Sequence, residues 1–155
     1  MQFTSKEDIE APIERVFAEI TDFQGFERSA LRRGADIKRT DTLRAPGVGV
    51  SWHAVFKLRG KQRTLDVNVA EYDPPNGITL GLVSASIEGQ MIADLVALSR
   101  GRTRMSVTLV LQPRSLAARL MMQSLKLARS NLTKRFKVRV AEYAMEVEER
   151  YQQSA

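Results

Sequence analysis

Cysteine is absent from this 155-residue chain, and histidine occurs once, as His53. Without cysteine the chain has no disulfide, no thiolate nucleophile and no thiolate metal ligand. A lone histidine cannot supply a histidine-rich metal site, and it leaves most catalytic triads without a base. We therefore expect a protein with no metal and no cofactor.

Long apolar runs are also missing. The longest stretch without a charge, residues 74–87, has 14 residues, whereas a membrane-spanning helix needs about 17–25. The first ten residues, MQFTSKEDIE, are too charged for a signal peptide. With 43% apolar and 27% charged residues, the composition is that of an ordinary globular domain. We expect one cytoplasmic domain over residues 1–155, with no transmembrane segment and no assigned oligomeric state.

Basic residues outnumber acidic ones, 24 to 18. Most of the excess lies from Arg114 onward, where nine basic residues accompany four acidic ones. A basic terminal element is typical of contact with nucleic acid, an anionic lipid surface or an anionic small molecule, and a solvated helix face is the alternative. No RNP signature, zinc-finger spacing or phosphate loop accompanies the charge, so we expect no specific nucleic-acid partner. Contact with a membrane surface stays open.

Apolar residues recur at helical spacing near both ends of the chain. After a first strand at residues 2–10, one short helix begins at Pro12, and a second runs from about residue 23 to 33, before Gly34. The segment 115–150 has no glycine or proline and predicts one long amphipathic helix capped by Ser115. At 1.5 Å per residue this helix would be about 54 Å long, so we expect it to bend or to overhang the domain. Its apolar stripe comprises Leu116, Leu120, Met121, Leu125, Ala128, Leu132, Phe136, Val140, Tyr143 and Val147.

Apolar and polar residues alternate along residues 48–58 and 65–69, which predicts two paired strands. A two-residue turn with Gly60 as its first central residue would place Phe56 opposite Leu65 and turn His53 outward. In that register, each apolar residue on the inner face of one strand lies opposite an apolar residue of the other strand.

Further strands are expected after the turn at residues 72–78, then at 89–98 and 105–111. The strand 89–98 is apolar on both faces, so its orientation depends on the next turn. An even-length turn around Gly101 would point Asp94 and Val96 inward, whereas a three-residue turn would reverse this.

Residues 9–22, Ile-Glu-Ala-Pro-Ile-Glu-Arg-Val-Phe-Ala-Glu-Ile-Thr-Asp, resemble the opening of the START-like superfamily. This group includes polyketide cyclase/dehydrase-like and lipid-transfer proteins of the SRPBCC type. The Tyr-Asp-Pro-Pro sequence at 72–75 and the long terminal helix also fit. The resemblance implies an α+β helix-grip fold, in which a seven-stranded antiparallel sheet curls around a long C-terminal helix, with two short helices after the first strand. It also implies a cavity for an apolar ligand between sheet and helix.

The residues themselves show only that the inner face of the sheet must be covered, and that the terminal helix is the large apolar cover available. A solid core and a cavity remain the two alternatives. If there is a cavity, we expect its ligand-binding residues to be Trp52, Ala54, Phe56, Leu65, Val67, Val69, Leu82, Ser84, Asp94, Val96, Met105, Val107, Met121, Leu125 and Leu132.

Our leading hypothesis is non-catalytic binding or transport of a small hydrophobic or amphipathic ligand. The first alternative is a cyclase, aromatase or dehydratase in which Asp94 moves a proton inside the same cavity. For Asp94 the open structural explanations are a salt bridge or a turn that points it outward. The second alternative is a basic surface adaptor for nucleic acid or an anionic membrane. The basic hairpin at residues 57–63 is a candidate for guiding an anionic amphiphile towards the cavity.

Overall fold

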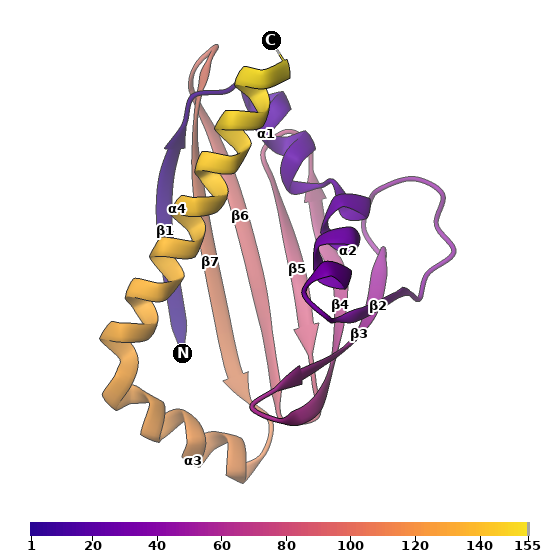
Figure 1. Cartoon of the computed structure of the whole chain (residues 1–155), viewed down its shortest axis with the longest axis vertical. Helices are drawn as coiled ribbons and strands as arrows, with labels where there is room; N and C mark the ends of the chain where they lie inside the picture. The colour runs from indigo at the N-terminus through magenta and orange to yellow at the C-terminus, as the bar shows by residue number, and fades with distance from the viewer. Residues whose placement is uncertain (155) are drawn as a thin grey trace.

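Seven antiparallel strands form one sheet in the computed structural model, which describes residues 1–154; Ala155, the last residue of the expected domain, lies outside the described residues. The strand order across the sheet is β1-β7-β6-β5-β4-β3-β2 (Figure 1). The elements are β1 (Gln2–Ile9), α1 (Ile13–Ile20), α2 (Phe23–Arg32), β2 (Asp36–Arg39), β3 (Ser51–Leu58), β4 (Lys61–Asp73), β5 (Gly77–Val83), β6 (Ile87–Ser99), β7 (Arg102–Pro113), α3 (Leu116–Leu125), the 3-10 turn η1 (Lys126–Ala128) and α4 (Arg129–Ser154).

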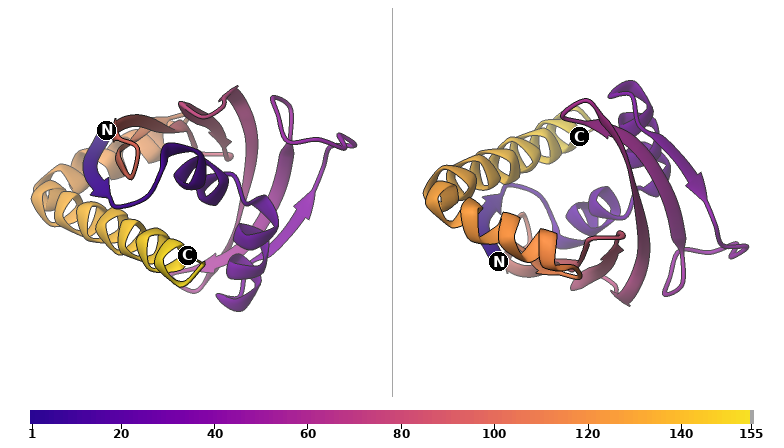
Figure 2. Two further views of the ribbon diagram at one scale, coloured as in Figure 1. Left: turned by 90° about the horizontal axis from the view of Figure 1, so that it is seen from above. Right: turned by 90° about the horizontal axis from the view of Figure 1, so that it is seen from below.

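The helices lie on the concave side of the sheet. Seen from above and below, the sheet curves around α1, while α4 runs along the side formed by β1 (Figure 2). The two short helices begin and end close to where the sequence predicts, and Asp22 caps α2 by accepting a hydrogen bond from the Gly25 amide. This is the expected α+β helix-grip arrangement.

The C-terminal helix is not continuous. Ser115 caps its start as predicted, accepting from the Ala118 amide at 3.1 Å. The helix then breaks at η1, and α3 turns away from α4 across one end of the sheet (Figure 1). The break lets Ala118 and Met122 become buried as α3 contacts β7, whereas a straight helix would carry these turns past the sheet. The expected bend is therefore confirmed.

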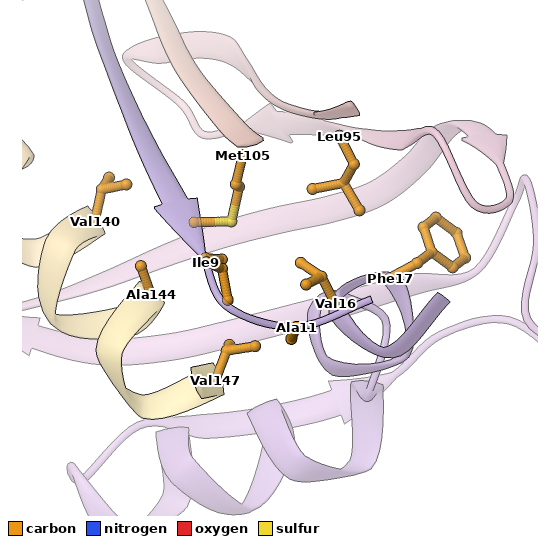
Figure 3. Packing of buried hydrophobic residues seen from close by; sticks show 9 residues of the cluster. All are labelled: Ile9, Ala11, Val16, Phe17, Leu95, Met105, Val140, Ala144 and Val147. Carbon is orange, nitrogen blue, oxygen red and sulfur yellow. The ribbon is translucent and has the colours of Figure 1, made fainter. Parts of the chain in front are cut away.

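A solid core fills the region where β1, α1, β6, β7 and α4 meet. Figure 3 shows Val140, Ala144 and Val147 of α4 directed towards Ile9 and Met105. Nearby, the fully buried Thr103 hydroxyl donates to the Ala11 carbonyl at 2.8 Å, which satisfies the polar group in this region.

The predicted register between β3 and β4 is wrong by two residues. The two central residues of the turn are Arg59 and Gly60, both with positive φ (52° and 77°), which is the type I′ geometry that favours glycine in second place. Trp52 therefore pairs with Val67 rather than with Val69. Because side chains alternate with a period of two, this shift leaves every residue on the expected face.

The orientation of β6 is the reverse of the one expected for an even-length turn. The turn after Ser99 has two residues, an even number, but the register shifts between Ala97 and Ser99 and leaves Leu98 without a partner. Such a β-bulge adds one residue to one strand and reverses which residues face inward. As a result Asp94 and Val96 are exposed on the outer side, and it is the odd-numbered residues that face the helices.

Candidate functional site

A cavity of about 540 Å³ lies between the concave face of the sheet, α2 and the middle of α4. This volume falls within the range typical of small-molecule sites, about 300–1,000 Å³. Six of the seven strands, β2 to β7, contribute to the wall of the cavity. The lining residues are Ile20, Phe23, Phe26, Glu27, Ile37, Trp52, Ala54, Val67, Ile78, Leu80, Met91, Ala93, Met105, Val107, Leu109, Phe136, Arg139, Val140 and Tyr143.

Aromatic contacts hold α2 over the sheet. The ring of Phe23 packs edge-on against Trp52, with centroids 5.1 Å apart, and Phe26 stacks on Tyr143 at 6.0 Å. The indole Nε1 of Trp52 donates a hydrogen bond to Glu27 Oε1 at 2.8 Å. These contacts connect α2 to β3 on one side and to α4 on the other, so the helix forms a wall of the cavity.

The rim of the cavity lies between α2 and α4. Phe26 is 45% exposed although it lines the cavity, and Arg139, on the facing helix, is exposed as well. Arg139 and Tyr143 are four residues apart and therefore share one face of α4. Phe26, Arg139 and Tyr143 therefore lie together where α2 and α4 face each other across the cavity.

Tyr143 is the unusual polar residue of the site. Its hydroxyl oxygen is buried and has no hydrogen-bond partner within residues 1–154. Burial raises the pKa of the Tyr143 hydroxyl above its usual value, and the negative charge of Glu19 raises it further. A buried hydroxyl without a partner is destabilising, so a ligand atom able to pair with it would be favoured.

Charged side chains are few along this wall. Of the lining residues only Glu27 and Arg139 carry a charge at neutral pH, and Glu27 is already bonded to Trp52. Within the described residues 1–154 no group of three histidine or acidic side chains is arranged to hold a metal ion. Nor is any helix in that range long and apolar enough to cross a membrane.

Five of the fifteen residues expected from the sequence line the cavity: Trp52, Ala54, Val67, Met105 and Val107. Four more belong to the strands next to it but not to its wall. Val69 is fully buried in a small core cluster with Val50 and Ile78, and Phe56, Leu65 and Leu82 are half-buried outside the lining.

The remaining six expected residues lie elsewhere. Asp94 and Val96 face outward because of the bulge at Leu98. Ser84 closes the β5–β6 connection, where its hydroxyl accepts from the Ile87 amide at 3.0 Å. The last three, Met121, Leu125 and Leu132, lie on the C-terminal helix nearer to its break than the lining residues.

The outward position of Asp94 removes the group to which the cyclase alternative assigned proton transfer. The expectation that Asp94 faces inward is wrong, because the bulge reverses the two faces of β6. The prediction for His53 is confirmed: it points outward, with Nδ1 2.7 Å from Asp66 Oδ1 on the neighbouring strand.

Sequence reasoning missed the contribution of α2 and the later part of the terminal helix. Phe23, Phe26 and Glu27 follow the i, i+3, i+4 spacing of one helix face, which is a readable signal for a surface turned towards the protein. Phe136 and Tyr143 belong to the predicted apolar stripe, but the break at η1 decides that this part of the stripe reaches the cavity.

Comparison with known proteins gives a match at the level of structure. No protein-family model matches the sequence, and none of the curated proteins matches it. The structure is similar to TTHA0849 from Thermus thermophilus, with a TM-score of 0.67 and 16% identity over 100% of this chain and 99% of that one. It is also similar to the Zhui aromatase/cyclase from Streptomyces sp. R1128 (TM-score 0.66, 14% identity, 97% and 95% covered).

A START superfamily protein from Mycobacterium smegmatis is a third similar structure, with a TM-score of 0.57 and 12% identity over 86% of this chain and 95% of that one. At such low identities the similarity concerns the fold. The chain therefore has the START-like, SRPBCC-type helix-grip fold, as the resemblance of residues 9–22 suggests.

Proposed function

We propose that this protein binds, and thereby carries, a small amphipathic ligand in the cavity between sheet and helices. The observation that carries the proposal is the space of about 540 Å³, whose wall is apolar except at the α2–α4 rim. An apolar body inside such a space is removed from water at a gain of about 25 cal/mol per Å² of apolar surface. The START-like fold of the neighbours described above supports the same general function.

The rim residues indicate the polar part of the ligand. Arg139 carries a positive charge there, and the Tyr143 hydroxyl is a donor without a partner in the described structure. A carboxylate, sulfonate or carbonyl oxygen can accept a hydrogen bond from a guanidinium or from a hydroxyl. We therefore assign a ligand with an apolar body and one hydrogen-bond-accepting, preferably anionic, end held between α2 and α4.

Trp52 makes this proposal measurable, because it is the only tryptophan in the chain and it lines the cavity. The probe is 1-anilinonaphthalene-8-sulfonate, which has an apolar ring system and one sulfonate. Binding in the cavity is expected to quench Trp52 and to give energy transfer to the probe with saturable, one-site behaviour. Organic extraction of the purified protein followed by mass spectrometry would identify a ligand that co-purifies.

A bulky substitution within the cavity supplies the decisive comparison. Ala93→Phe fills part of the space, whereas Ala97→Phe places the same ring at an exposed position of the same strand. Excluding two ligand methylenes at about 0.8 kcal/mol each predicts about tenfold weaker binding for Ala93→Phe. Equal affinity in both variants, with the fold intact by circular dichroism, would rule out the cavity as the binding site.

A further inference from the structure

One end of the sheet gathers two basic segments that are distant in sequence. Antiparallel alternation brings the β3–β4 hairpin, the β5–β6 connection and the start of α3 to the same end, opposite α1 and the C-terminal end of α4 (Figure 1). The Arg114 guanidinium donates to the Ser84 carbonyl at 2.7 Å, which holds the β7–α3 connection against the β5–β6 connection. We call residues 57–63 and 114–129 together the basic end.

The two segments of the basic end carry an excess of positive charge. Residues 57–63 and 114–129 contain no acidic side chain, and no ion pair within residues 1–154 involves any of their cations. Eight exposed basic residues lie here: Lys57, Arg59, Lys61, Arg63, Arg114, Arg119, Lys126 and Arg129.

The opposite end of the molecule behaves differently. There Arg104 pairs with Asp8 at 2.9 Å, and Arg150 pairs with Glu19 at 2.8 Å. Cations outside any ion pair thus gather at the basic end, whereas Arg104 and Arg150 near the other end are paired with carboxylates. Such an asymmetry orients a protein towards an anionic partner.

The basic end also exposes leucine. Leu116, Leu120 and Leu127 are 72%, 58% and 94% exposed. Leu116 and Leu120 are four residues apart and lie on one side of α3, while Ala118 and Met122 bury the opposite side. Leu127 follows in η1, directly after α3. This segment is thus apolar on two sides, and only one of them is covered by the protein.

We propose that the basic end docks on the surface of an anionic lipid bilayer. In this arrangement the three leucines enter the boundary between headgroups and acyl chains, and the flanking Arg119 and Lys126 approach the lipid phosphates. Exposed leucines beside cations are the composition of helices that lie in a membrane interface. Nucleic acid is a poorer partner, because it would contact the cations but leave the leucines exposed. A second copy of this chain is also a poorer partner, because it would bring like charges together.

The test is co-sedimentation with vesicles of phosphatidylcholine containing 30% phosphatidylglycerol, compared with pure phosphatidylcholine. Wild-type protein is expected to bind the anionic vesicles, and 0.5 M salt is expected to weaken this binding. The variant L116S/L120S/L127S removes the exposed apolar side, and R119Q/K126Q/R129Q removes three cations. Each is expected to lower vesicle affinity by about tenfold or more.

Matched controls come from other exposed sites. V96S/L98S removes apolar side chains from the outer surface of β6, and R28Q/R32Q/R33Q removes three cations from α2 and the residue that follows it. Both should bind vesicles like the wild type, and so should Ala93→Phe, which separates docking from ligand binding in the cavity. Equal binding to both vesicle types, full binding by the leucine variant, or tighter binding to a single-stranded RNA oligonucleotide than to vesicles would overturn the proposal.

Discussion

The carboxylate of Glu27, on α2, accepts a hydrogen bond from the indole Nε1 of Trp52, on β3, over 2.8 Å. This bond joins a short helix to a strand that is 25 residues further along the chain, directly at the cavity wall. The guanidinium of Arg39 lies 5.7 Å from the Trp52 ring and Phe23 packs on its edge, so the indole is fixed from several sides. The Glu27–Trp52 bond is therefore one of the contacts that hold α2 at the cavity wall, with the ring contacts of Phe23 and Phe26.

Replacing Glu27 with leucine should therefore loosen α2. The variant keeps the side-chain bulk but leaves the indole N–H without its acceptor, at a loss of about 1–2 kcal/mol in the free energy of unfolding. Urea unfolding followed by Trp52 fluorescence measures this loss. Glu27→Gln is the control, because its amide oxygen still accepts the bond. An unchanged midpoint in Glu27→Leu would show that the bond contributes nothing.

Tyr143→Phe should separate stability from ligand binding. The substitution removes a buried hydroxyl that has no partner in the described structure, so the free energy of unfolding should stay the same or rise by about 1 kcal/mol. Binding of the sulfonate probe should weaken by about fivefold to tenfold if the hydroxyl donates to the ligand. Thermal melts and probe titrations measure the two effects. A variant that binds as tightly as the wild type would exclude a role for the hydroxyl.

The same residue predicts a dependence of stability on alkaline pH. Burial first, and Glu19 second, raise the pKa of Tyr143 in the folded protein. Above pH of about 10 the unfolded chain releases this proton while the folded protein still keeps it, so the free energy of unfolding should fall as pH rises. Urea unfolding at pH 9 to 11 should show a steeper fall for the wild type than for Tyr143→Phe. Parallel curves for the two proteins would contradict this prediction.

Asp94→Asn should leave ligand binding unchanged. The carboxylate is exposed on the outer side of the sheet and does not line the cavity, so the affinity for the probe should stay within about twofold of the wild-type value, a change below 0.5 kcal/mol. Fluorescence titration measures it, with Ala93→Phe as the variant that does weaken binding. A clear loss in Asp94→Asn would mean that β6 presents its other face to the ligand.

Several features of the fold follow from local sequence alone. Alternation of apolar and polar residues assigns Trp52 and Ala54 to the inner face, and an error of two residues in the register does not change that assignment, because the side-chain period is two. The cap at Ser115 is likewise local, since it needs only one hydroxyl and the next turn of helix.

The other features of the fold and of the cavity depend on packing between segments that are far apart in the sequence. The orientation of Asp94 depends on one extra residue, Leu98, whose bulge is visible only when β6 is paired with β7. The break between α3 and α4 depends on where the sheet ends, and the cavity depends on how far α2 stands from the strands that it covers. Periodicity encodes which side of an element is apolar, but the distance between two apolar surfaces arises only when the whole chain is folded.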